Sequence, residues 1–315
     1  MVKIRTKNST ISIVMYHYVR EVKNSLYPNL KGLEFNNFKN QINFFEKNFN
    51  ILSNDDFNEI ISTKKIPLKP SVILTFDDGY IDHYKYVFPF LGKKKIKANF
   101  YPPKKVIENK IVLDVNKIQF ILEKEQNSRK ILKEIDNLLT RENKKPISEK
   151  DKKNINLTSR FDNKETILVK RLLQFYLPKK IREKITNLLF EKILNISLND
   201  FSKSLYMNEK QIKEMYKENM SFGSHGDYHY WWEHLKKKDQ EKEIKNSINF
   251  FKKINFDTTS LSVCFPYGSH NDETLKLLHK YNISYALTSK PGVINKKNLT
   301  KNFTYPRLDT NDFPS

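Results

Sequence analysis

The chain has 315 residues, of which 38% are hydrophobic and 13% aromatic, which is enough for a substantial core in one large domain or two smaller ones. Its single cysteine, Cys264, excludes an intramolecular disulfide and a pair of cysteine ligands for zinc, and favours a reducing compartment. The formal net charge is +21. Because the basic residues are mostly scattered lysines, we expect a diffusely solvated basic surface and no specific nucleic acid, with a membrane surface, a nucleotide-linked sugar or an acidic lipid glycan left open as anionic partners.

The N-terminal segment argues against a signal peptide. It starts with the basic MVKIRTK, but the apolar stretch from Ile11 to Val19 is broken by Ser12, Tyr16 and His17 and lacks a small-residue cleavage site. No run approaches the roughly 18 apolar residues needed to span a bilayer. We therefore expect a cytoplasmic protein, with peripheral contact to an anionic inner membrane as an open hypothesis.

Short apolar runs alternate with amphipathic segments in both flanks of the chain, a pattern typical of a parallel α/β fold. The pattern predicts strands at residues 11–16, 72–76, 97–101, 220–224, 261–265 and 283–288. It predicts helices at residues 36–48, 208–218 and 239–254. In such folds, whether the sheet is open or closed into a barrel, we expect the functional groups at the carboxyl ends of the strands.

The middle of the chain, residues 104–205, has a different composition. It contains no glycine, and its apolar residues keep helical spacing, as in the run from Leu177 to Leu194. It carries 24 Lys or Arg against 14 Asp or Glu, a net charge of +10. We interpret it as a basic helical insertion that either contacts an anionic membrane or covers the site.

Two sequence motifs stand at the ends of predicted strands. In TFDDGY, Asp77 and Asp78 follow a buried strand, and Gly79 permits a sharp turn. In FGSHGDYHYWWEH, His225 and His229 are four residues apart, so that one helical turn or a compact loop could aim both imidazoles at one point. An HxxxH pair alone is a weak signal, but two histidines and a carboxylate from another strand end form a common catalytic metal triad.

The motifs TFDDGY, GSHGDYH and FPYG, in this order, resemble those of the NodB-homology polysaccharide deacetylases, carbohydrate esterase family four. The segments IVMYHYV and ALTSKPGVIN are also similar to members of this family. The resemblance covers roughly residues 11–101 and 206–310. It implies a deformed (β/α) barrel built from residues 1–103 and 206–315, with the segment 104–205 as a helical insertion outside the common pattern.

The resemblance also implies roles for the matching residues. Asp78, His225 and His229 would bind a divalent metal, for which zinc is favoured over nickel or cobalt. Asp77 would be the general base that takes a proton from the attacking water. A backbone N–H near Pro266 and Tyr267 would stabilise the oxyanion together with the cation.

Two departures from the family pattern concern the base and the acid. The Arg that many members carry before Pro-Tyr is replaced here by Cys264-Phe265, and Arg307 is the candidate substitute, with a surface salt bridge as its alternative. The Leu-x-Leu-His motif that supplies the general acid is not visible. His17 is the best replacement, against a structural role at a strand end, and His270 is a second candidate.

The remaining histidines and the aromatic cluster have weaker interpretations. We expect His83 and His279 at the surface on helix-like segments, and His234 at the end of the aromatic turn. The cluster of Tyr230, Trp231 and Trp232 favours a platform for a sugar ring, with Trp231 as a substrate-binding candidate, but core packing explains it equally well.

These observations predict a metal-dependent hydrolase that removes an N-acetyl group from a sugar, in a surface-polysaccharide or lipopolysaccharide precursor. Its partner would be the acetylated sugar or glycan substrate. One alternative is a deacylase of the same fold that acts on an O-acyl group or a non-sugar amide. Others are a non-catalytic glycan- or polyanion-binding protein and a basic nucleic-acid-binding protein, whose binding would depend steeply on salt and need no metal.

Overall fold

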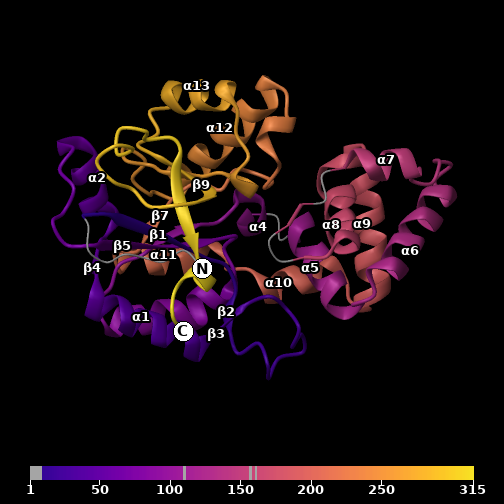
Figure 1. Cartoon of the computed structure of the whole chain (residues 1–315), viewed down its shortest axis with the longest axis horizontal. Helices are drawn as coiled ribbons and strands as arrows, with labels where there is room; N and C mark the ends of the chain where they lie inside the picture. Colours follow the sequence, from indigo (N-terminus) through magenta and orange to yellow (C-terminus); the bar gives the residue numbers. More distant parts are fainter. Residues whose placement is uncertain (1–8, 109–110, 156–157, 160–161) are drawn as a thin grey trace. The chain divides into compact units, whose positions relative to one another are not determined.

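The computed structural model describes residues 9–108, 111–155, 158–159 and 162–315. Two compact units make up this described chain (Figure 1). The first, here called the barrel unit, comprises the described residues within Met1–Glu21, Lys31–Lys110 and Leu205–Ser315. The second, here called the helical unit, comprises those within Val22–Leu30 and Ile111–Ser204.

The barrel unit is built around a parallel, curled sheet. Its strands follow the order β7-β6-β5-β1-β10-β9-β8. The bounds are β7 Ser221–Phe222, β6 Asn99–Tyr101, β5 Ser71–Asp77, β1 Ile11–Tyr16, β10 Tyr305–Asp309, β9 Ala286–Pro291 and β8 Val263–Cys264, with β4 Asn50–Ile51 also paired to β5. The two ends of this order meet through an isolated parallel bridge between Ser224 and Val263. This arrangement confirms the predicted deformed (β/α) barrel.

The central strands explain why the sheet forms at these residues. Every residue of β5 is buried, as expected for a strand covered on both faces. The ring of Phe76 stacks between those of Tyr16 and Phe100, with centroid distances of 4.8 and 4.9 Å. The strand ends at Asp77, and the chain stays buried from there through His83.

Helices and short turns connect the strands of the barrel unit. Their bounds are α1 Phe35–Asn48, α2 Asn54–Thr63, α3 Phe88–Lys93, α4 Lys104–Glu108, α11 Glu209–Lys217, α12 Lys237–Lys253 and α13 Asp272–Lys280, with a π-helix at His83–Val87 and 3₁₀ turns at Trp232–His234, Pro266–Gly268 and Thr310–Asp312. A separate two-stranded ladder pairs β2 Val19–Arg20 with β3 Leu33–Glu34. Helices α12 and α13 pack side by side (Figure 1). Helix α12 buries Ile244, Ile248 and Phe251 on one face, as its spacing predicted.

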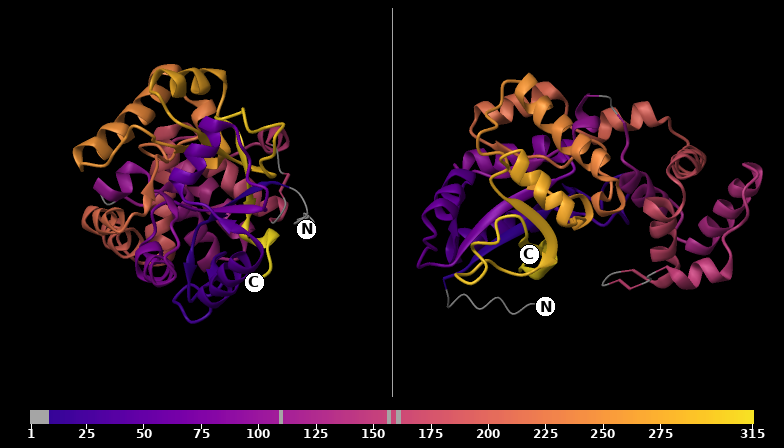
Figure 2. Two further views of the ribbon diagram at one scale, coloured as in Figure 1. Left: turned by 90° about the vertical axis from the view of Figure 1, so that its left-hand side faces the viewer. Right: turned by 90° about the horizontal axis from the view of Figure 1, so that it is seen from above.

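The helical unit is a bundle of packed helices (Figure 2). Its elements are α5 Asp114–Lys124, α6 Ser128–Arg141, α7 Glu149–Asn154, α8 Lys164–Arg171, a π-helix at Leu172–Tyr176, α9 Lys179–Leu194 and α10 Leu198–Leu205. Helix α9 buries Ile185 and Leu189 and packs against α5. None of the helices in the described part of the chain combines the length and the apolar character needed to cross a bilayer.

The strand predictions succeed for β1 and β5 and fail for their neighbours β10 and β9 in the sheet. Strand β1 has the predicted bounds, and β5 is longer by one residue at each end. The predicted strand 283–288 is shifted, because β9 begins only at Ala286. The sequence analysis missed β10, which contains Pro306 and so lacks one backbone donor. This missed strand carries Arg307.

Candidate metal centre and active site

The chemically reactive side chains of the barrel unit meet at the carboxyl ends of its strands. Asp77 ends β5, and His17 follows β1 by one residue. Asp78 turns away from β5 in the left-handed region, with φ of 69°, while its N–H donates to the carbonyl of Tyr101 over 3.1 Å. His225 lies three residues after β7. The parallel sheet thus brings together residues that lie as far apart in sequence as His17 and His225.

Asp78, His225 and His229 form a buried cluster. The Oδ1 atom of Asp78 lies 3.5 Å from Nε2 of His225 and 3.3 Å from Nε2 of His229. Its other oxygen, Oδ2, accepts a hydrogen bond of 2.5 Å from the hydroxyl of Tyr80. Within the described part of the chain, Oδ1 has no hydrogen-bond partner. A buried acceptor oxygen that faces two imidazole nitrogens fits a divalent cation, which prefers this donor set.

The protonation of the two histidines supports the same interpretation. The Nδ1 atom of His225 donates to the carbonyl of Cys264 over 2.6 Å, which leaves Nε2 directed at Asp78. Burial disfavours the imidazolium of His225, but Cys264, Asp78 and Asp77 raise its pKa well above the ordinary value. Burial lowers the pKa of His229 to about 3. A bound cation would release the proton from His225, since a ligand nitrogen needs its lone pair.

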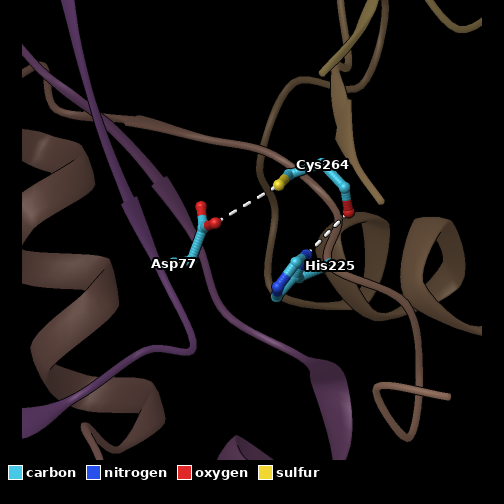
Figure 3. A group of neighbouring side chains, drawn as sticks. All are labelled: Asp77, His225 and Cys264. Carbon is cyan, nitrogen blue, oxygen red and sulfur yellow. Dashed lines mark hydrogen bonds between the residues drawn. The ribbon is translucent and has the colours of Figure 1, made fainter. Parts of the chain in front are cut away.

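A second group of possible ligands overlaps the first and consists of Asp77, His225 and Cys264 (Figure 3). Their ligand atoms lie within 4.8 Å of one another. Both oxygens of Asp77, however, accept hydrogen bonds from Arg307, over 2.9 Å to Oδ1 and 2.7 Å to Oδ2. Because this carboxylate is already paired with a cation, the Asp78 group is the better candidate for a metal.

Arg307 is fully engaged in the barrel interior. Its side chain is 2% exposed, its Nε donates to the carbonyl of Thr288 over 2.9 Å, and its Nη1 lies 3.3 Å from Oγ1 of Thr75. The alternative of a surface salt bridge is therefore wrong. Burial alone would raise the pKa of Asp77, but Arg307 and His225 lower it to about 2, so Asp77 is ionised. The thiol of Cys264 donates a hydrogen bond to Oδ2 of Asp77 over 3.4 Å.

His17 stands at the exposed side of this group. Its Nε2 lies 3.9 Å from Oδ2 of Asp77, and its side chain is 38% exposed. Its backbone carbonyl accepts a hydrogen bond of 2.8 Å from Nε2 of His83. The structure therefore places His17 between the solvent and the buried carboxylate.

The prediction that His83 lies at the surface is wrong. Its ring is fully buried, with centroids 5.3 Å from that of Phe76 and 5.8 Å from that of Phe100. Helical spacing misled the prediction because His83 begins a π-helix, whose wider turn changes the face that each residue presents. Burial lowers the pKa of His83 to about 4. His279 is exposed, as predicted.

An aromatic pair borders the cluster. Tyr267 stacks on Trp231 at a centroid distance of 4.5 Å, and its ring lies 4.6 Å from that of His229. Pro266, which precedes Tyr267, is buried. Trp232 is fully buried against Phe265, so core packing explains this tryptophan. Trp231 is therefore linked to the candidate ligand His229 through the ring of Tyr267.

Three other aromatic or imidazole candidates have structural partners away from the cluster. Tyr230 stacks on Tyr228 at 5.3 Å. The ring of His270 stacks on Phe265 at 4.7 Å, and its Nδ1 bonds the carbonyl of Gly268. His234 lies 3.8 Å from the carboxylate of Glu233. His270 thus packs on Phe265, whereas His17 lies 3.9 Å from Asp77.

Three residues of the site share an unusual backbone conformation. Asp78, His229 and Tyr267 have φ of 69°, 61° and 58°. Such left-handed conformations cost on the order of 1–3 kcal/mol each for residues other than glycine and persist where the surrounding fold imposes them. Three of them around one cluster indicate that the surrounding fold imposes the conformation of these residues.

The sequence analysis missed the contribution of Tyr80. Its hydroxyl holds Oδ2 of Asp78, and burial and the charge of Asp78 raise its pKa well above the ordinary value, so it remains a donor. Its place in the TFDDGY motif was the available signal.

Comparison with known proteins gives this site a context. The sequence profile described as "Polysaccharide deacetylase" matches residues 64–138 and 150–286, which is more than half of the chain. The chain belongs to the polysaccharide deacetylase family. This confirms the resemblance to the NodB-homology group. The matched residues include Asp77, Asp78, His225 and His229, whereas Arg307 lies beyond them.

One curated relative is similar over a limited part of the chain. YxkH of Bacillus subtilis (strain 168), whose name also refers to a polysaccharide deacetylase, is 29% identical over 91 residues. These residues make up 29% of this chain and 32% of that protein, so the match spans about a third of the relative's length.

Solved structures are similar over nearly the whole chain. The Streptococcus pyogenes deacetylase PplD, solved in complex with acetate, has a TM-score of 0.57 at 19% identity, covering 96% of this chain and 92% of that one. IcaB from Ammonifex degensii has a TM-score of 0.56 at 14% identity, covering 95% and 91%. A de-N-acetylase from Aggregatibacter actinomycetemcomitans also has 0.56 at 14% identity, covering 96% and 95%. These similarities establish the fold.

Proposed function

We propose that this chain is a metal-dependent hydrolase that removes an N-acetyl group from a sugar, in a precursor of a surface polysaccharide or lipopolysaccharide. The observation that carries the proposal is the buried group of Asp78, His225 and His229, placed directly beside an ionised carboxylate, Asp77. Membership of the polysaccharide deacetylase family supports an acetylated glycan as the substrate class.

The cation would be held by Oδ1 of Asp78 and by the Nε2 atoms of His225 and His229. Zinc suits this mixture of nitrogen and oxygen donors. When bound, the cation supplies Lewis-acid chemistry at the substrate carbonyl and increases the acidity of a nearby water. Tyr80 supports the site by holding the second oxygen of Asp78.

Asp77 takes the proton of the attacking water in this proposal. Arg307 holds both of its oxygens in a fixed orientation; Oδ2 also accepts from the thiol of Cys264, so Oδ1 is the oxygen with a lone pair left for the proton. The guanidinium also keeps the carboxylate ionised at neutral pH, since the pKa of Asp77 is about 2. Arg307, from β10, thus serves as the orienting cation that the FPYG motif lacks.

His17 protonates the leaving amine. Its partial exposure and its distance of 3.9 Å from Asp77 place it at the border of the cluster, where a departing sugar amine can reach it. The backbone N–H of Tyr267, which follows Pro266, is the donor for the oxyanion. The part of the Trp231 ring that Tyr267 does not cover offers an apolar surface to a sugar ring.

The decisive experiment measures metal content and acetate release on the same preparations. Mass spectrometry of the wild type should find about one transition metal per chain, and the double variant His225→Ala, His229→Ala should contain none. His279→Ala, which removes an exposed histidine, serves as the matched control and should keep the metal.

Acetate release then separates the possible reactions. Acetate from N-acetylated sugars by the wild type and the control, but not by the double variant, supports the proposal. Release from O-acetylated sugars alone would redirect the proposal to an O-deacylase. A wild type that binds no metal, even after zinc is supplied, would overturn it.

A further inference from the structure

The segment between the two candidate histidine ligands, Gly226-Asp227-Tyr228, is held from outside the cluster. His225 and His229 lie in a loop between β7 and the 3₁₀ turn Trp232–His234, and not on one turn of a helix. Gly226 and His229 both have positive φ, of 79° and 61°. Because the loop lacks helical hydrogen bonds, the spacing of the two imidazoles depends on other partners.

Helix α12 supplies the first of these partners. The Oε2 atom of Glu243 accepts hydrogen bonds from the N–H of Asp227 over 2.8 Å and from the N–H of Tyr228 over 3.0 Å. One turn further along the helix, Asn246 donates to Oδ2 of Asp227 over 2.6 Å. Glu243 is only 5% exposed, so these bonds form in a site with little water.

Helix α4 holds the carbonyl side of the same segment. The N–H of Lys104 donates to the carbonyl of Gly226 over 3.1 Å, and the N–H of Lys105 donates to that of Asp227 over 3.0 Å. The ammonium of Lys104 also lies 3.6 Å from the carboxylate of Asp227. The N–H groups of the loop thus bind α12, and the carbonyl groups of the loop bind α4. The loop is therefore fixed on both sides.

Glycine at position 226 makes the approach of Glu243 sterically feasible. A Cβ atom there would lie 2.8 Å from Oε2 of Glu243 and 3.2 Å from the ring of Trp232. Any larger residue would also be strained at a φ of 79°. The loop and the carboxylate therefore fit each other only with glycine between the first histidine and Asp227.

We propose that Glu243 is a positioning residue, which fixes the spacing of His225 and His229 by binding the two backbone amides between them and so sets the affinity of the site for its metal. This inference rests on the proposed function. Glu243 has no direct contact with the cation in this proposal. Its effect passes through the loop, as for other residues that orient metal ligands through hydrogen bonds.

Three substitutions distinguish the position of the acceptor from its charge. Glu243→Gln keeps a carbonyl oxygen at the same reach and removes the charge. Glu243→Asp keeps the charge but withdraws the acceptor by one methylene. Glu243→Ala removes both. Gln240→Ala is the matched control, since Gln240 lies on the same helix, is equally buried and bonds Leu235 and Thr274 instead of the ligand loop.

The experiment is a competition for zinc between each purified full-length protein and a chromophoric chelator. We expect the zinc affinity of Glu243→Ala and Glu243→Asp to fall about 10- to 100-fold, with Glu243→Gln within a few-fold of the wild type and Gln240→Ala unchanged. Hydrogen exchange of the amides of Asp227 and Tyr228 should accelerate in Glu243→Asp but not in Glu243→Gln. If Glu243→Ala fails to fold, the Asp and Gln variants still decide the question.

The outcomes separate this inference from the function on which it rests. Wild-type affinity in both Glu243→Ala and Glu243→Asp, with zinc bound by the wild type, overturns the positioning role alone. An equal loss in Gln240→Ala also overturns it, because the effect would then follow from the stability of α12. A wild type without zinc overturns the proposed function and the inference together.

Discussion

Asp77 and Asp78 are adjacent in sequence and almost equally buried, at 1% and 2% exposure, yet their surroundings differ. Asp77 ends a regular strand, and Arg307 binds both of its oxygens. Asp78 has left the strand with φ of 69°, so that one oxygen meets Tyr80 and the other faces two imidazoles.

This difference shows how one backbone turn separates two kinds of carboxylate. Successive side chains of a strand point to opposite faces, and the positive φ of Asp78 redirects its side chain further. Asp77, which is already paired with the guanidinium of Arg307, is suited to accept a proton and release it again. Asp78, which is not paired with an arginine, is suited to bind a metal. Substitution of each carboxylate and of its partners tests this assignment of roles.

The largest effect should come from Asp78→Asn. The amide removes the negative charge that faces His225 and His229, so we expect loss of the metal and of all measurable deacetylation. Metal content per chain by mass spectrometry is the measurement. Tyr80→Phe, which removes only the hydrogen bond to Oδ2, is the matched control and should keep a more weakly bound metal, by about 10- to 100-fold. Full metal content in Asp78→Asn would contradict the assignment of Asp78 as a metal ligand.

Asp77→Asn should separate chemistry from metal binding. The asparagine cannot accept a proton from water, so we expect kcat to fall about 10²- to 10⁴-fold. Its metal content should equal that of the wild type, because Arg307 and not the metal is the partner of this side chain. The two adjacent variants thus give opposite results in one metal assay. Metal loss from Asp77→Asn would indicate that the two carboxylates share the cation.

The variant Arg307→Met tests how much the ion pair between Arg307 and Asp77 contributes to the stability of the fold. It leaves a buried carboxylate without its partner, so we expect the free energy of unfolding in urea to fall by about 3–5 kcal/mol. The double variant Asp77→Asn, Arg307→Met should recover much of this loss, because it no longer buries an unpaired charge. Additive losses in the double variant would show that the pair contributes no coupling energy.

The smallest effect concerns His83, whose Nε2 holds the backbone of His17 beside Asp77. Its pKa is lowered to about 4 from an ordinary value of 6.5, so the neutral ring stabilises the fold above pH 6.5 and this stability is lost as the pH falls through 4. The full loss is about 3 kcal/mol. His83→Gln keeps an N–H donor without titrating, so its stability should change less than that of the wild type between pH 6.5 and 4. Parallel stability curves for the two proteins would contradict this assignment.

The sequence revealed much of the fold and of the cluster through local patterns. The apolar run of β1 was located to the residue, because a strand covered on both faces needs continuous apolar side chains. The motifs that contain Asp78, His225 and His229 were visible because each follows such a run. His83 was misplaced because a π-helix leaves no signature in a helical period.

Local sequence patterns thus predict the alternation of strands and helices and the set of carboxylates and imidazoles at the strand ends. The pairing of Arg307 with Asp77, 230 positions away, and the contact of Glu243 with the loop between the histidines follow from the three-dimensional fold. The physical reason is the sheet order, in which β10 lies next to β1 and β1 next to β5. Local periodicity fixes which face of a strand is buried, whereas the neighbour that a buried charge meets depends on which distant strands pair.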